Sequence, residues 1–145
     1  MTKVLIVDDH PIVRAGLLEL LGSVPDIEVV GFAGRGDVAV QLALSLRPEV
    51  VLMDIEMPVM DGIEATRAIL DEAPDMVVIM LSTFDTVECL DRAVAAGARG
   101  FLRKDVPPMA LVAGIRTAAA TWVSFIPGLE PALLDGKRPS LLPCS

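Results

Sequence analysis

The sequence predicts an α/β fold built on a parallel sheet. Short apolar runs rich in β-branched residues alternate five times with segments of helical periodicity, which is the pattern of repeated βα units. Hydrophobic residues make up 53% of the 145 residues, as expected when strands are buried on both faces. A chain of this length supports one domain with a proper core. The expected strands are residues 3–7, 27–32, 50–54, 76–82 and 100–104.

The first three expected helices have recognisable starts and stops. The first spans 11–22, where Pro11 suits a helix start because the first turn does not need its missing N–H. The second spans 37–46 and ends before Pro48, which cannot continue a helix. The third opens at Asp61, directly after the strand at 50–54 and its loop.

The last two helices follow the strands at 76–82 and 100–104. Asp85 is expected to cap the fourth helix, which ends at Gly97. The fifth starts at Asp105 and two prolines, and its apolar face is expected to include Leu111, Val112, Ile115, Ala118, Ala119 and Trp122.

The pattern of the chain changes after this helix. Residues 1–122 are expected to form the domain, and residues 123–145 an atypical tail rich in proline and leucine. Only a short helical turn fits into the tail, so a helix-turn-helix has no room there. The tail's leucines are expected to pack on a folded surface, either of this domain or of a neighbouring chain: Leu129, Leu133, Leu134, Leu141 and Leu142.

Bulk properties exclude several classes of function. The net charge of −8 argues against direct nucleic-acid binding, because phosphate contacts need a basic face. No apolar stretch is long enough to span a membrane, and the N-terminus enters a strand without the apolar segment of a signal peptide. Cys89 and Cys144 form no metal pattern, so a reduced cytoplasm is the expected location.

Reactive side chains stand where the expected strands end. Asp8 and Asp9 follow the first strand, and Asp54 ends the third. Ser82 ends the fourth, and Lys104 ends the fifth. Because the carboxyl ends of parallel strands share one edge of the sheet, these side chains should meet there. Three acids, a hydroxyl and an ammonium suit a divalent cation and a phosphoryl group.

This set of residues resembles the receiver domain of two-component response regulators from about residue 3 to residue 122. The matching segments are Val7-Asp8-Asp9-His10, Met53-Asp54-Ile55-Glu56-Met57-Pro58, Asp61-Gly62, Met80-Leu81-Ser82-Thr83 and Gly97-Ala98-Arg99-Gly100-Phe101-Leu102-Arg103-Lys104. The segment from Asp9 to Leu17 is similar to the NarL/FixJ subfamily, whose members carry a C-terminal helix-turn-helix. The resemblance implies a flavodoxin-like, doubly wound (βα)5 fold with five parallel strands in the order 2-1-3-4-5.

Each matched residue then has an expected role. Asp54 would be the nucleophile that forms an acyl phosphate, because a carboxylate oxygen can attack phosphorus in line. Mg²⁺ or Mn²⁺ would be held by Asp8, Asp9 and Asp54; the resemblance implies direct binding by Asp9, water-mediated binding by Asp8 and a contact from the Glu56 backbone carbonyl. Lys104 would pair with Asp54 and then with the phosphoryl oxygens.

Two further residues would read out the phosphoryl group. Ser82 would donate its hydroxyl to it. Phe101 would be the coupled aromatic, which can signal only by burial because it lacks a tyrosine hydroxyl. An ordinary core position is the alternative reading of Phe101. The single histidine, His10, is interpreted as a structural residue at a helix start rather than a catalytic group.

Three functions are weighed. The first is a receiver phosphorylated by a partner histidine kinase, with DNA reached only through an output domain and with a homodimer through the first and fifth helices left open. It would be no enzyme beyond self-phosphorylation from small donors and autodephosphorylation. The second is a Mg²⁺-dependent aspartyl phosphohydrolase, although no Asp-x-Asp follows the first strand and no cap domain is present. The third is a non-phosphorylated interaction module, which the intact acid set, Ser82 and Lys104 disfavour.

Overall fold

A parallel sheet forms the centre of the computed structural model, which describes residues 1–57, 59–82, 87–104, 106–118 and 123–124. Its strands are Thr2–Val7 (β1), Ile27–Ala33 (β2), Val50–Asp54 (β3), Val77–Ser82 (β4), Gly100–Arg103 (β5) and Val123–Ser124 (β6). The helices are Pro11–Gly22 (α1), Gly36–Leu46 (α2), Gly62–Glu72 (α3), Val87–Ala96 (α4) and Pro108–Thr117 (α5).

The strands lie in the order β2-β1-β3-β4-β5-β6, and every neighbouring pair is parallel. The predicted flavodoxin-like order 2-1-3-4-5 is therefore confirmed. The two-residue β6 was not predicted. It pairs with β5 through Gly100 and Phe101, so the sheet continues one strand beyond the expected edge.

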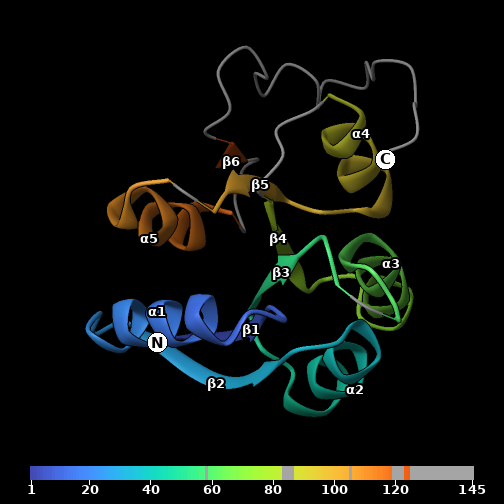
Figure 1. Ribbon diagram of the computed structural model, residues 1–145. Coiled ribbons are helices and arrows are strands. Elements are labelled where there is room, and N and C mark those ends of the chain that lie inside the picture. The colour runs from blue at the N-terminus through green and yellow to red at the C-terminus, as the bar shows by residue number, and fades with distance from the viewer. Residues whose placement is uncertain (58, 83–86, 105, 119–122, 125–145) are drawn as a thin grey trace.

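Helices cover both faces of the sheet (Figure 1). α1 and α5 lie on one face, and α2, α3 and α4 lie on the other. Successive side chains along each strand point to opposite faces and so join the two cores in turn. In β1, Leu5 and Val7 join the core under α2, α3 and α4, whereas Val4 and Ile6 join the core under α1 and α5. Period-two burial on both faces explains why the strands read as continuous apolar runs.

Local signals set most helix ends where the sequence predicted them. α1 begins at Pro11 and ends at Gly22. α3 starts with a capping box, in which the Asp61 carboxylate accepts the Glu64 N–H at 2.8 Å and the Glu64 side chain accepts the Asp61 N–H at 3.4 Å. The end of α2 is marked by Arg47, whose left-handed conformation closes the last turn.

The C-terminal part differs from the prediction. α5 ends at Thr117, whereas the sequence analysis extended its apolar face to Trp122. Leu111, Val112, Ile115 and Ala118 are buried as expected. Ala119, Trp122, the helix cap at Asp85 and the tail leucines lie outside the described residues. The division at residue 122 stays a prediction, and β6 lies just beyond it.

Among the described helices, none has both the length and the apolar character needed to cross a lipid bilayer.

Candidate functional site

The carboxyl ends of β1 and β3 bring the acidic residues together. Val7 is in register with Met53, so Asp8, one residue further on, lies beside Asp54 at the end of β3. The Asp8 N–H also donates to the Ala33 carbonyl at 2.9 Å, which holds the chain against the end of β2. Asp8 and Asp54 therefore lie together at one edge of the sheet, where the sequence predicted them.

Lys104 joins the acids from β5. Its backbone N–H donates to the Ser82 carbonyl at 2.9 Å, which carries the ladder between β4 and β5 one residue past the strand end. Its Nζ lies 3.1 Å from Asp8 Oδ2 and 3.1 Å from Asp54 Oδ1. One ammonium therefore bridges two carboxylates that are both fully buried.

Burial and charge shift the titration of this pair. Burial, with the nearby charge of Asp8, raises the pKa of Asp54 to about 6, although Lys104 and the Glu56 N–H oppose the rise. Burial works against the charged form of Lys104, but Asp54 and Asp8 outweigh it and raise the pKa of Lys104. The lysine is therefore a fixed positive charge at neutral pH.

The two oxygens of Asp54 differ in environment. Oδ1 accepts the Glu56 N–H at 3.3 Å and contacts Lys104. Oδ2 is buried and has no hydrogen-bond partner among the described residues. An uncompensated buried carboxylate oxygen is costly, so this atom is placed for a further ligand or for bond formation.

The site suits a divalent cation. Ligand atoms of Asp8, Asp9, His10 and Asp54 all lie within 4.8 Å of one another. Three carboxylates against one ammonium leave an excess of two negative charges, which one divalent cation would balance. Carboxylate oxygens grouped in this way are what a hard cation such as Mg²⁺ needs. Glu56 lies two residues after Asp54, in the loop that follows β3, and is exposed.

Ser82 and Phe101 lie on the neighbouring strands. Ser82 ends β4 and is buried, and it is in register with Arg103 of β5. Phe101 lies on β5, fully buried in the core beneath α2, α3 and α4. Both positions fit the roles that the sequence analysis gave them, which stay predictions.

A residue of α1 supports the site in a way that the sequence did not predict. The guanidinium of Arg14 lies over the Phe32 ring, 5.4 Å from its centroid, and Nη1 donates to the Asp8 carbonyl at 3.3 Å. A Cβ on Gly34 would stand 2.7 Å from that nitrogen, so glycine leaves room for it. The sequence offered only Phe32 near the end of the expected strand at 27–32 as a signal, because the exposure of its ring is visible only in the structure.

Gly62 holds the loop after Asp54 close to β3. A Cβ there would collide with the Asp54 carbonyl oxygen, and the Gly62 N–H donates to the Ile55 carbonyl at 2.8 Å. The Asp61-Gly62 pair thus combines a helix cap with a close backbone approach to the candidate nucleophile.

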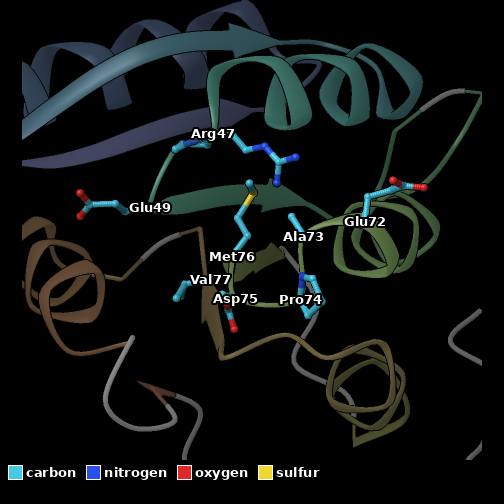
Figure 2. Close-up of a pocket in the computed structure, with 9 residues that line it drawn as sticks. Arg47, Glu49, Glu72, Ala73, Pro74, Asp75, Met76 and Val77 are labelled. Atoms are coloured by element: carbon cyan, nitrogen blue, oxygen red, sulfur yellow. The ribbon is translucent and has the colours of Figure 1, made fainter.

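Hollows in the described part of the chain also lie outside the acidic cluster. A cavity of about 510 Å³ opens at the amino ends of β3 and β4 (Figure 2), where Arg47, Glu49, Glu72 and Asp75 mix both charges. It is at the opposite edge of the sheet from Asp54. A second hollow of about 330 Å³ lies between α1 and α5, and its lining includes Leu17, Leu111, Arg103 and Lys104. This α1–α5 groove adjoins the site.

Comparisons with known proteins agree with this geometry. The model of the response regulator receiver domain matches residues 4–116. The uncharacterized transcriptional regulatory protein YxjL of Bacillus subtilis (strain 168) is 40% identical over 81% of this chain and 54% of YxjL. The nitrate/nitrite response regulator protein NarL of Escherichia coli (strain K12) is 35% identical over 93% of this chain and 62% of NarL.

A solved structure is similar over most of both chains. A two-component response regulator of the LuxR family from Aurantimonas sp. SI85-9A1 has a TM-score of 0.82 and 31% identity, covering 88% of this chain and 91% of that chain. The chain spans between about half and two thirds of the length of the curated relatives named above. On the match over residues 4–116 and the shared sheet order, the chain belongs to the response regulator receiver domain family, and its relatives are regulators of the NarL/LuxR type.

Proposed function

We propose that Asp54 accepts a phosphoryl group from a partner histidine kinase in a Mg²⁺-dependent step, or with Mn²⁺ in place of Mg²⁺. The observation that carries this proposal is the asymmetry of Asp54. One oxygen is held by Lys104 at 3.1 Å, and the other is buried and has no hydrogen-bond partner in the part of the chain that the structure describes. A nucleophile for in-line transfer needs one oxygen oriented and one oxygen free to attack.

Charge neutralisation is the main catalytic requirement of phosphoryl transfer. The cation, held by Asp8, Asp9, Asp54 and the Glu56 carbonyl, would neutralise charge on the phosphoryl oxygens. Lys104 would release Asp54 Oδ1 and pair with the new phosphoryl group. Asp8 keeps a contact with Lys104, 3.1 Å from Oδ2, and so holds the ammonium near the reacting oxygen.

The phosphoryl group would be read through the strands beside it. Ser82 is buried at the end of β4, and its hydroxyl would donate to a phosphoryl oxygen on Asp54. Phe101 would then repack within the core beneath α4. Because packed cores tend to have discrete arrangements, this change would alter the surface made by α4, β5 and α5.

The kinase would dock beside the site. The α1–α5 groove has an apolar lining that ends at Lys104, and Ile12 and Met109 are exposed apolar side chains at the starts of α1 and α5. An apolar surface around a charged reaction centre suits a helical partner that presents one reactive side chain. A homodimer through α1 and α5 is compatible with the same surface.

Relatives indicate the wider role. YxjL and NarL are named as a transcriptional regulatory protein and a response regulator protein. By this analogy a longer protein that contains this domain would control transcription in the cytoplasm. It would bind DNA only through an output domain. Receiver domains are generally signalling domains rather than enzymes, so self-phosphorylation from small donors and autodephosphorylation are the most that is expected of this chain.

Acetyl phosphate with Mg²⁺ tests the assignment. Intact mass should show one added phosphoryl group, and hydroxylamine should remove it, because acyl phosphates are labile to that nucleophile. Asp54→Asn should abolish labelling. The control is Asp71→Asn, which changes an exposed aspartate of α3 and should be labelled like the parent.

The same experiment separates the alternatives. A single stable phosphoryl group on Asp54 supports the receiver. Continuous release of phosphate without accumulation would indicate a phosphohydrolase. Labelling of neither the parent nor the control would leave an interaction module that works without phosphorylation.

A further inference from the structure

His10 lies inside the acidic cluster rather than apart from it. Its Nδ1 is 3.0 Å from Asp8 Oδ1 and 3.0 Å from Asp9 Oδ1. Its backbone N–H also donates to Asp8 Oδ1 at 2.8 Å, which fixes the residue against the carboxylate. The ring makes no capping hydrogen bond to α1, although His10 is the N-cap residue. The structural role expected for a helix-start histidine therefore does not use the ring.

The spacing of these atoms matches a coordination sphere. Two ligand atoms at adjacent corners of an octahedron with bonds of about 2.1 Å lie about 3.0 Å apart. Nδ1 has that separation from both carboxylate oxygens. A separate observation indicates that the pocket lacks an occupant, since among the described residues the buried Oδ2 of Asp54, a member of the same cluster, has no hydrogen-bond partner.

We propose that His10 Nδ1 is a ligand of the cation in this pocket and shifts its selectivity from Mg²⁺ towards Zn²⁺, Co²⁺ or Ni²⁺. Imidazole nitrogen suits these cations, whereas Mg²⁺ prefers oxygen. Coordination through Nδ1 needs the neutral imidazole with its proton on Nε2. The His10 side chain is 61% exposed, so water can accept a hydrogen bond from that Nε2–H. The inference rests on the cation site of the proposed function but not on phosphorylation of Asp54.

Metal binding at His10 would also affect the regulation of Asp54. A cation held by His10 would occupy the carboxylates that Mg²⁺ needs for phosphoryl transfer. Labelling of Asp54 would then depend on the supply of transition metal as well as on the kinase.

Nitrogen NMR of the ring gives a direct test. His10 is the only histidine, so its ring signals need no assignment. Adding Zn²⁺ to the metal-free full chain should move the Nδ1 resonance with saturation at one equivalent, and saturating Mg²⁺ should move it less. Because the signal comes from the ring, Zn²⁺ bound to a cysteine would not reproduce it. Asp9→Asn should weaken the Zn²⁺ response, and Asp71→Asn should not.

Titration calorimetry supplies the second measurement. Removing groups that merely support metal ligands lowers affinity by roughly 10–100-fold, so loss of a ligand should cost at least as much. His10→Ala should therefore lower Zn²⁺ affinity by about tenfold more than it lowers Mg²⁺ affinity. Equal losses for both cations, with an unmoved Nδ1 resonance in the parent, would overturn the proposal and leave ordinary hydrogen bonds from Nδ1.

Acetyl phosphate labelling of the parent keeps the two proposals apart. If Zn²⁺ moves the Nδ1 resonance of His10 but acetyl phosphate never labels Asp54, the result supports His10 as a ligand and contradicts the phosphoacceptor function. Normal labelling with no ring shift would do the reverse.

Discussion

Asp54 is a carboxylate held out of solvent beside Asp8 and one ammonium, Lys104. Burial and the charge of Asp8 raise its pKa from an ordinary value of 3.8 to about 6. Across this interval the folded chain keeps a proton on Asp54 that the unfolded chain has released. The free energy of unfolding should therefore fall as the pH rises from 3.8 to about 6.

Asp54→Asn should remove this pH dependence. In metal-free buffer the variant should be more stable than the parent at pH values above the folded pKa, by up to about 3 kcal/mol, and equally stable at strongly acidic pH. Lys104 keeps Asp8 as its partner in both proteins. Urea unfolding over a pH series measures the difference. A variant with the same pH profile as the parent would contradict this account of Asp54.

Val59, in the loop after Asp54, has a strained backbone conformation. Its φ is 72°, a region that β-branched residues rarely adopt, and its side chain is 76% exposed. Val59→Asn should stabilise the chain by about 1 kcal/mol, because asparagine tolerates this conformation. Val59→Thr keeps the branched Cβ and should bring no such gain. Thermal unfolding of the three proteins side by side decides it.

The residues of the candidate site could be predicted because their placement depends only on where the strands end. Parallel strands bring their carboxyl ends to one edge, so Asp8, Asp54 and Lys104 followed from the apolar runs before them. The orientation of a ring does not follow from such a pattern. The contacts of His10 with two acids, and of Arg14 with Phe32, depend on side-chain rotamers and on the space left by a neighbouring glycine.

Two glycines in the helices are expected to respond in opposite ways to substitution by alanine, one losing and one gaining stability. A Cβ on Gly62, at the start of α3, would collide with the Asp54 carbonyl oxygen. Gly62→Ala should therefore destabilise the chain by more than about 1 kcal/mol and slow the labelling of Asp54. Gly16, within α1, has no described atom within 4 Å of the added Cβ, so Gly16→Ala should stabilise by roughly 0.5–1 kcal/mol. Denaturant midpoints test both, and a stabilising Gly62→Ala would refute the close approach.

The elements were predicted where periodicity was long and bounded. Five strands and the helix α1 have bounds within a residue or two of those expected, because proline, glycine and the change of period mark them. The failures lie near the C-terminal edge. Apolar spacing extended α5 past Thr117, and a two-residue strand such as β6 has no period to detect.

In the molecule as a whole, the sheet separates the two hydrophobic cores, and an ion pair connects elements that are far apart in the sequence. Arg116 of α5 donates to both carboxylate oxygens of Asp26, at 3.0 and 2.7 Å, and so links α5 to the turn before β2. That side-chain hydrogen bond lowers the pKa of Asp26. Both groups are exposed, so the pair orients α5 more than it stabilises the fold.

The outer edge of the sheet gives the last prediction. β6 pairs with β5 through Val123 and Ser124, next to Phe101. A chain ending at residue 122 would leave the β5 edge unpaired, whereas one ending at residue 124 would keep it covered. The shorter chain should be less stable by about 1–2 kcal/mol, the worth of one or two hydrogen bonds, and should associate more readily in light scattering. Equal stability and equal mass for the two chains would mean that β6 adds nothing to the sheet, and that β5 alone keeps Phe101 in the core beneath α4.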